Sequence, residues 1–598
     1  MSFAHFKLQR GALLLAVGLT CSLGAAQAEP WTFGIMADTQ WTTNDAANNP
    51  NTVALGIMNQ ILPQFVNKKV KFVIQLGDLT DNGSTAGLDV WATAAQQLYT
   101  AGIGFYPARG NHEPSLAAAN RFISNFPQTQ GQGANVAGAT GHRSPTTPAG
   151  LGGLTYAFEY QNATFIAIDQ FVRTNGTGTT ANSAVLDQVD WISQTLTTKP
   201  ANTHAFLFAH KPLIGQNHVD NLLGANPSSN PTERNKLIKA MAANGARYFL
   251  GGHDHMFSRT IVKSPDGTAS IRNIIHSSDS YKFYIPTIPS NDQTYNASNR
   301  VETPVSQELF TVGYYIAKVD GPRLTVTHYA SDNGCGGSLG SGKDCDLKAT
   351  PVLNFFKRET YGYSLNGQSF VIQPGATFTS ITDNSPTGAG WVGTRFAIVD
   401  GTNATSKTFY DGRVAVQDVS TGWSGRSEAD AANTQGFKSD VLSLWGMHNA
   451  VGSEQGDTVT VSLSYEDTRG PVIVKGKFFD ETNWAAAVNG NYGGTAKFIV
   501  GPWKAGYGLG TYGVDPATKT AWAVVNRGGE FVAAKSADGD LNGDGVIDSR
   551  DIALLNAQLN NAASSLPAAD LDGDGKITAL DARKLALICS LPSCAIAQ

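Results

Sequence analysis

The chain has 598 residues, of which 41% are hydrophobic and 15% are charged. This length is too great for a single hydrophobic core, since domains usually hold about 100–200 residues, and the composition is that of globular domains rather than of a disordered chain. The formal net charge is −5. Because a basic surplus is missing, the sequence excludes a general nucleic-acid or anionic-membrane binder.

The N-terminus has the pattern of an export signal. Lys7 and Arg10 precede the apolar stretch Gly11–Ala25, and Ala26–Ala28 provides a small-x-small cleavage pattern. We therefore expect residues 1–28 to be a signal peptide that is removed. No later stretch is apolar over the ~20 residues that a membrane span needs. The mature protein is expected to be secreted or periplasmic.

Residues from about 30 to 330 alternate strand-like and helix-like patterns. Apolar runs such as Trp31–Ala37 and Phe72–Leu76 alternate with amphipathic stretches such as Thr52–Val66 and Leu186–Leu196. This alternation predicts a layered α/β domain. From about 350 to 533 the helical period is lost, and short alternating runs such as Val459–Tyr465 predict a β-rich sandwich. The sequence leaves open whether this sandwich is a spacer or a binding domain.

Polar residues follow five of the predicted strands, at the point where each apolar run ends. These segments are Asp38-Thr39-Gln40, Gly77-Asp78-Leu79-Thr80-Asp81, Arg109-Gly110-Asn111-His112-Glu113, His210-Lys211-Pro212 and Gly251-Gly252-His253-Asp254-His255. Loops at the carboxyl ends of strands converge on one crevice in α/β sheets, so we expect these side chains to meet. We also expect Gly77, Gly110 and Gly252 to let the backbone turn sharply there.

The five segments supply aspartate, asparagine and histidine side chains. These ligands suit borderline or hard divalent ions, and the segments contain no thiolate that would select soft ones. A carboxylate can bridge two ions, whereas asparagine and neutral histidine each fill one position. Two ions about 3.5–4 Å apart activate water and stabilise an in-line displacement. The sequence therefore predicts a two-metal hydrolytic site.

The order of these segments closely resembles the calcineurin-like metallophosphoesterase superfamily, whose signature runs D-x-H, G-D-x-x-D, G-N-H-D/E, a lone His and G-H-x-H. The resemblance implies a four-layer α/β/β/α domain that hydrolyses phosphoric esters with a bridging hydroxide and two transition-metal ions (Mn, Fe or Zn). By position, it implies a first metal on Asp38, Asp78 and His255, and a second on Asp78, Asn111, His210 and His253. It also implies that His112 assists the leaving group and that Asp81 orients His112.

One position departs from this signature. Gln40 stands where the family usually has histidine, and an amide oxygen is a weaker ligand than imidazole. The sequence leaves open whether Gln40 binds the first metal. The same departure leaves room for a rival function, a non-catalytic extracellular binding or scaffold protein that retains the fold.

The substrate is left open among monoesters, diesters, nucleotides and lipid headgroups. We expect loops around the metals, such as Gln128–Gly150 and Tyr281–Pro304, to decide it. Six histidines outside the motifs are interpreted as structural or surface residues: His142, His204, His218, His276, His328 and His448.

Two aligned twelve-residue loops lie near the end of the chain. The calcium-binding candidates are Asp540, Asn542, Asp544, Val546, Asp548 and Asp551 in the first loop, and Asp570, Asp572, Asp574, Lys576, Thr578 and Asp581 in the second. The spacing is that of EF-hand loops, with Gly545 and Gly575 at the position that needs glycine. Aspartate at position 12 and the missing entering helix resemble dockerin modules. The resemblance implies two calcium ions and a cohesin-like partner, with a purely stabilising intramolecular role as the alternative.

Beyond residue 28 the chain has four cysteines in two local pairs, Cys335 with Cys345 and Cys589 with Cys594. An even, locally paired count in an exported protein predicts disulfides. Zinc is the alternative, although neither pair has further cysteine or histidine companions nearby. The predicted segments are 1–28 (signal peptide), 29–349 (phosphoesterase domain), 350–533 (β-rich domain) and 534–598 (dockerin-like module).

Overall fold

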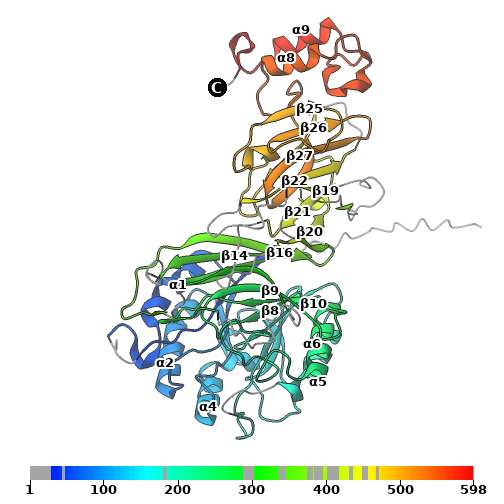
Figure 1. Cartoon of the computed structure of the whole chain (residues 1–598). Helices are drawn as coiled ribbons and strands as arrows, with labels where there is room; N and C mark the ends of the chain where they lie inside the picture. Colours follow the sequence, from blue (N-terminus) through cyan, green and yellow to red (C-terminus); the bar gives the residue numbers. More distant parts are fainter. Residues whose placement is uncertain are drawn as a thin grey trace, which may run out of the picture.

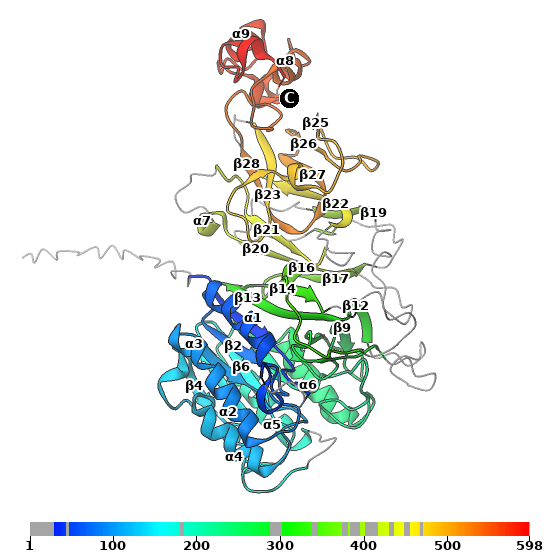
Figure 2. The same ribbon diagram turned by 90° about the vertical axis from the view of Figure 1, so that its left-hand side faces the viewer.

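The computed structural model describes residues 29–42, 47–179, 185–286, 302–333, 335, 345–372, 381–382, 395–400, 417–429, 436–447, 455–466 and 471–596. The predicted signal peptide lies outside these residues. Three bodies follow one another along the molecule in chain order: an α/β domain, a β-rich domain and a small helical module (Figures 1 and 2). None of the helices in the described ranges has the length and apolar character needed to cross a membrane.

The first sheet of the α/β domain has the strand order β16-β14-β13-β1-β2-β3. Its strands are β1 (Trp31–Met36), β2 (Phe72–Gln75), β3 (Gly104–Pro107), β13 (Thr311–Asp320), β14 (Arg323–Asp332) and β16 (Phe356–Ser364). The strands β1, β2 and β3 are parallel, and β13 joins β1 antiparallel. One face is covered by α1 (Leu55–Asn67), α2 (Thr85–Ala94), α3 (Gln96–Thr100) and α4 (Leu116–Asn125).

The second sheet has the order β12-β9-β10-β8-β7-β6-β5-β4. Its strands are β4 (Thr140–Arg143), β5 (Tyr156–Tyr160), β6 (Ala163–Ile168), β7 (His204–Ala209), β8 (Tyr248–Gly251), β9 (Phe257–Lys263), β10 (Ser270–Ile275) and β12 (Glu302–Glu308). The strands β6, β7, β8 and β10 run parallel. The helices α5 (Val189–Thr198) and α6 (Pro231–Ala243) pack on this sheet.

The two sheets face one another across an aromatic core. Phe33 of β1 lies edge-on to Phe165 of β6 with ring centroids 5.1 Å apart, and Phe72 of β2 does the same at 5.0 Å. Each sheet therefore has a helix-covered face and a face in the shared core, which explains why the central strands are continuous apolar runs. The predicted four-layer α/β/β/α arrangement is confirmed (Figure 1).

Two element boundaries differ from the predicted ones. The helix expected from Thr52 begins at Leu55, because Thr52 ends a short 3-10 turn with a left-handed φ of 63°. The strand β16 pairs with β14 although it follows the expected domain limit at 349. We therefore propose to place that limit after Ser364.

The β-rich domain is a sandwich of two six-stranded sheets, ordered β17-β20-β21-β28-β23-β24 and β18-β19-β22-β27-β26-β25. The first sheet contains β17 (Ser369–Ile372), β20 (Gln417–Ser424), β21 (Val441–Trp445), β23 (Val472–Lys477), β24 (Ala485–Ala486) and β28 (Gly529–Lys535). The second contains β18 (Ile381–Thr382), β19 (Arg395–Asp400), β22 (Gln455–Ser464), β25 (Lys497–Val500), β26 (Thr511–Asp515) and β27 (Thr520–Arg527). A short helix, α7 (Arg426–Ala429), follows β20.

The C-terminal module contains α8 (Ser549–Asn556) and α9 (Ala579–Leu587). Each helix begins with a capping box, formed by Asp548 with Asp551 in α8 and by Thr578 with Asp581 in α9. The buried apolar side chains of the module belong to the same hydrophobic core as the β-sandwich. The predicted disulfides are both present, with Cα atoms 6.3 Å apart for Cys335–Cys345 and 5.3 Å apart for Cys589–Cys594.

Candidate metal centre

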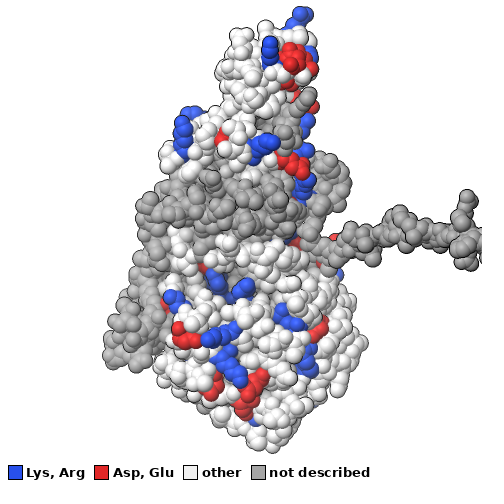
Figure 3. All heavy atoms as spheres, turned by 90° about the vertical axis from the view of Figure 1, so that its right-hand side faces the viewer, with Lys and Arg blue, Asp and Glu red and all other residues white. Residues whose placement is uncertain are grey.

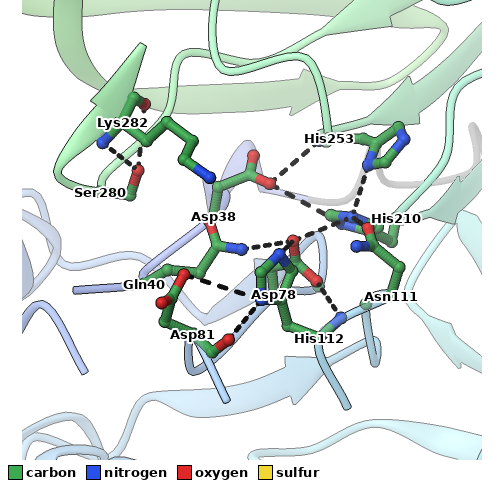
Figure 4. A network of polar contacts seen from close by, with 12 residues as sticks. Asp38, Gln40, Asp78, Asp81, Asn111, His112, His210, His253, Ser280 and Lys282 are labelled. Carbon is green, nitrogen blue, oxygen red and sulfur yellow. Dashed lines mark hydrogen bonds and ion pairs between the residues drawn. The ribbon is translucent and has the colours of Figure 1, made fainter. Parts of the chain in front are cut away.

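The predicted metal-binding side chains meet at the carboxyl ends of parallel strands from both sheets. Asp38, Asp78 and Asn111 follow β1, β2 and β3, whereas His210 follows β7 and the last two histidines follow β8. In Figure 4 the side chains of Asp78, Asn111, His210 and His253 lie close together, with Asp38 beside them. Residues up to 217 positions apart in the sequence, such as Asp38 and His255, are thus brought into one group.

Asp38, Asp78 and His255 form a buried group in which one ligand atom from each residue lies within 4.8 Å of the other two. Nε2 of His255 is 3.6 Å from Oδ1 of Asp38. Nδ1 of the same imidazole is 2.6 Å from the Lys282 carbonyl oxygen, a contact in which that ring nitrogen donates. This hydrogen bond leaves Nε2 as the ring nitrogen that could bind a metal ion.

A second group surrounds Nε2 of His210. This nitrogen lies 3.2 Å from Oδ2 of Asp78, 2.7 Å from Oδ1 of Asn111 and 3.1 Å from Nδ1 of His253. Nδ1 of His210 is 3.1 Å from the Leu76 carbonyl oxygen, where it acts as the donor. Four potential ligand atoms therefore converge on one point, and Asp78 is common to both groups.

Some oxygen atoms of the centre have no hydrogen-bond partner in the described part of the chain that would satisfy them, and a cation could take that place. The Nε2 amide of Gln40 donates to Oδ2 of Asp78 at 2.7 Å. The Oε1 atom of Gln40 and the Oδ2 atom of Asp38 are both buried without a hydrogen-bond partner among the described residues. Orphaned buried oxygens cost free energy unless something satisfies them. Carboxylate, amide and imidazole groups are ligand types that a divalent metal ion takes, and such an ion would satisfy these two acceptors.

The backbone of this centre is strained. Asp38, Asp78, His253 and His255 all have left-handed backbones, with φ of 47°, 52°, 74° and 50°. Each such residue costs on the order of 1–3 kcal/mol, and such strain clusters at functional sites.

The motif glycines act in two different ways. Gly77 has the positive φ, 94°, that a sharp turn requires. Gly110 and Gly252 were expected to allow sharp turns as well. They are required instead because a side chain at either position would collide with a neighbouring carboxylate. A Cβ at Gly110 would lie 1.9 Å from Oδ1 of Asp78, and one at Gly252 would lie 2.5 Å from Oδ2 of Asp38.

The two C-terminal loops present their oxygens in different surroundings. In the first loop, Oδ1 of Asp551 accepts from the backbone N–H groups of Leu541 and Asn542, and Oδ1 of Asp540 is buried without a hydrogen-bond partner among the described residues. In the second loop, carboxylate oxygens of Asp570, Asp572 and Asp574 lie within 4.8 Å of one another and are more exposed. Both arrangements fit hard cations such as calcium.

Comparison with protein-family models gives two matches. Residues 32–257 match the calcineurin-like phosphoesterase model, and residues 538–586 match the dockerin type I domain model. The chain carries a calcineurin-like phosphoesterase domain and a dockerin type I domain. The first is a domain of phosphoester hydrolases. Comparison with curated proteins found no match.

Several solved structures are similar to this chain at low identity. A dimetal phosphatase from Danio rerio is 15% identical, with a TM-score of 0.31 over 50% of this chain and 95% of its own. The structure of PhoD is 12% identical, with a TM-score of 0.38 over 57% of this chain and 70% of its own. A purple acid phosphatase from yellow lupin seeds is 12% identical, with a TM-score of 0.36 over 54% of both chains.

Burial and neighbouring charges shift the pKa values of the candidate ligands in different directions. Burial raises the pKa of Asp38 to about 7. Burial alone would also raise the pKa of Asp78, but the His210 and His112 imidazoles outweigh it and hold that pKa well below its usual range. Burial lowers the pKa of His253 to about 4 and that of His255 to about 3, so both are neutral at pH 7, as metal binding requires.

His112 lies on the open side of the phosphoesterase centre, with 27% of its side chain exposed. Its backbone N–H donates to Oδ1 of Asp78 at 3.0 Å, and its Nε2 lies 3.8 Å from Oδ2 of the same residue. Its Nδ1 is 2.5 Å from the Asp81 carbonyl oxygen and 3.7 Å from the Asp81 carboxylate. The main chain of Asp81, more than its side chain, therefore orients the imidazole.

Several residues around the phosphoesterase centre were not singled out from the sequence. Glu113 is fully buried and accepts from the backbone N–H groups of Thr80 and Gly110, which joins two of the ligand loops. Asp220 lies 3.4 Å from Nε2 of His253 and forms an ion pair with Lys211. Glu113 belongs to a motif and could have been found there, whereas Asp220 has no such signal because its loop is irregular.

His218 was interpreted as a structural or surface residue, but it lies beside the centre. Its ring centroid is 4.2 Å from that of His253, and its Nδ1 is 2.8 Å from Oδ1 of Asp254. Asp254 is buried within the last motif and also accepts from the backbone N–H of Gln216. Asp254 thus anchors the loop that contains Gln216 and His218. The sequence pattern does not connect this loop to the site.

Proposed function

We propose that this protein is an exported, metal-dependent hydrolase of phosphoric esters. The observation that carries the proposal is the convergence of both ligand groups on Asp78, together with buried oxygens of Asp38 and Gln40 that lack a hydrogen-bond partner among the described residues. The match to the calcineurin-like phosphoesterase model supports the same chemistry.

In this proposal Asp38, Asp78 and His255 hold one ion, and Asp78, Asn111, His210 and His253 hold the other. Gln40 assists the first ion through its orphaned oxygen. When bound, two such ions supply Lewis acidity and a nucleophilic water for in-line attack on phosphorus. The ions are of the Mn, Fe or Zn type, in keeping with oxygen and imidazole ligands.

The chain's own contribution to the reaction lies in His112. Its Nε2 is the ring nitrogen that remains available, because Nδ1 is engaged by the Asp81 carbonyl oxygen. The Asp78 carboxylate counteracts burial and raises the pKa of His112 above its ordinary value, which favours the protonated imidazole. His112 is therefore placed to give a proton to the departing alkoxide oxygen.

A screen of the metal-loaded protein tests this function. The protein lacking residues 1–28 is loaded with Mn, Fe or Zn and assayed on phosphate monoesters, phosphate diesters and nucleotides. We expect turnover of at least one class, and its loss when a chelator removes the ions. A protein that contains two ions but hydrolyses none of these esters would support the rival scaffold function instead.

The C-terminal module is proposed to bind two calcium ions and to dock a cohesin-like protein, as its match to the dockerin type I model supports. Export through residues 1–28 agrees with this partner.

On the face of the molecule in Figure 3, the described basic and acidic side chains are interspersed rather than gathered by sign. This face therefore has no basic stripe for nucleic acid among its described residues.

A further inference from the structure

A short strand forms a rim beside the metal centre. The strand β11 (Lys282–Phe283) pairs antiparallel with β15 (Cys345–Asp346), and Cys345 is bonded to Cys335. Nδ1 of His255 donates to the carbonyl oxygen of Lys282 at 2.6 Å. The backbone N–H of Tyr281 donates to the carbonyl oxygen of Gln40 at 3.2 Å. The rim is thus fixed both to the metal-binding residues and to a cross-linked strand.

The side chain of Lys282 extends from this rim toward Asp38 and Gln40 (Figure 4). Its ammonium group lies over two aromatic rings, 5.7 Å from the centroid of Tyr281 and 5.7 Å from that of Tyr284. Within the described part of the chain, no carboxylate oxygen lies within the 4.0 Å of an ion pair with this ammonium. Cation–π contacts hold the ammonium in place without neutralising it.

Tyr284 continues the rim along the ligand histidines. Its ring centroid is 5.0 Å from that of His255 and 5.1 Å from that of His218, which it meets edge-on. The tyrosine ring is therefore packed between two imidazoles of the centre. This packing fixes the ring over which the Lys282 ammonium lies.

A fixed cation beside two bound metal ions experiences like-charge repulsion, which an anion between them relieves. A phosphate monoester carries about two negative charges at neutral pH because its second pKa is about 6. A diester carries one. The rim therefore stabilises the more highly charged ester selectively.

We propose that Lys282 is a substrate-binding residue that selects phosphate monoesters over diesters, with the Tyr281 and Tyr284 rings holding its ammonium group in place. This inference rests on the proposed phosphoesterase function. It assigns to β11 the substrate choice that the ligand set leaves open.

The test compares two substrates that release the same nitrophenol, p-nitrophenyl phosphate and bis-p-nitrophenyl phosphate. Loss of one charge-assisted hydrogen bond to the substrate lowers kcat/KM by roughly 10- to 100-fold. We expect Lys282→Gln to lose that factor in kcat/KM on the monoester, mainly through KM, and much less on the diester. Lys282→Arg should retain most of the monoester activity, because it keeps the charge.

The matched control is Lys236→Gln, which removes an exposed lysine of α6. The metal content of Lys282→Gln should equal that of the wild type, because the lysine is not a ligand. Equal losses on both esters, or no loss on either, would overturn the inference while leaving the proposed function standing. Hydrolysis of neither ester by the wild-type protein would overturn this inference, and the lack of turnover on nucleotides as well would overturn the proposed function.

Discussion

Asp78 belongs to both ligand groups of the centre. Replacement by asparagine keeps its shape but removes the charge that a bridging ligand supplies. We expect Asp78→Asn to lower the metal content and abolish turnover together. Elemental analysis and kinetics check this, with Asp190→Asn as a control because that carboxylate is exposed on α5. A variant that still binds two ions and hydrolyses its substrate at the wild-type rate would contradict the shared-ligand assignment.

His112 is expected to act on the leaving group rather than on the metal. The variant His112→Ala should keep its metal while losing roughly 10²–10⁴ in rate, the usual scale of acid–base assistance. The loss should be smaller for nitrophenyl esters, because nitrophenolate leaves without much help. Rates on esters of nitrophenol and of a simple alcohol measure the difference. Equal losses on the two leaving groups would argue against the acid role.

At the scale of the elements, the first calcium loop is built around a carboxylate that resists ionisation. Burial, with help from the Asp551 and Asp544 carboxylates, raises the pKa of Asp540 to about 6. In the calcium-free protein, the stability due to protonated Asp540 is complete below about pH 4, near the pKa of an unperturbed aspartate. It is lost as the pH rises through 6.

The melting temperature in chelator should therefore fall between pH 5 and pH 7 because of Asp540. Asp540→Asn should flatten that dependence, since asparagine does not titrate. Calcium should stabilise the wild type more at pH 7 than at pH 5, because the ion needs the ionised carboxylate. Calorimetry of both proteins with and without calcium checks this. The same pH dependence in both proteins would rule out Asp540 as the cause.

At the scale of the whole molecule, a buried ion pair joins the phosphoesterase domain to the sandwich. Nε and Nη2 of Arg272 in β10 donate to the two carboxylate oxygens of Asp418 in β20 at 2.9 and 2.6 Å. Removing one partner of such a pair costs about 3 kcal/mol, because the other charge stays buried. Arg272→Met should show this loss in denaturant unfolding, and adding Asp418→Leu should restore part of it.

An exposed ion pair provides the comparison for this effect. Lys239→Met breaks the pair of Lys239 with Asp266, whose side chains are 47% and 36% exposed. We expect it to destabilise the protein far less than Arg272→Met does, because an exposed ion pair contributes little to stability. If Arg272→Met destabilises the protein no more than Lys239→Met does, the interdomain pair makes no special contribution.

The calcium module is joined to the sandwich by a shared core. Leu541, Leu555 and Leu585 of the module belong to the same apolar cluster as Ile473 and Tyr512 of the sandwich. A chain ending after Lys535 should therefore keep phosphoesterase activity but melt at a lower temperature in its sandwich domain. Activity assays and calorimetry test this. Loss of activity in a still-folded phosphoesterase domain would show that the module supports catalysis.

The strands that present the site, the five candidate ligand segments and the two calcium loops were all predictable from the sequence. These features are local, because each ligand lies within a few residues of the strand that presents it. Alternating apolar runs and short spacings are therefore enough to find Asp38, Asp78, Asn111, His210 and the last two motif histidines.

The surroundings of those candidate ligands became apparent only in the folded protein. The contacts of Lys282, Tyr284, His218 and Asp220 with the centre arise from irregular loops, which have no period that a sequence pattern could show. The strand β16 joined the first sheet, and the calcium module joined the sandwich core, through pairings between distant segments. Such pairings depend on which faces meet after folding, and this information is spread over the whole chain rather than held in one motif.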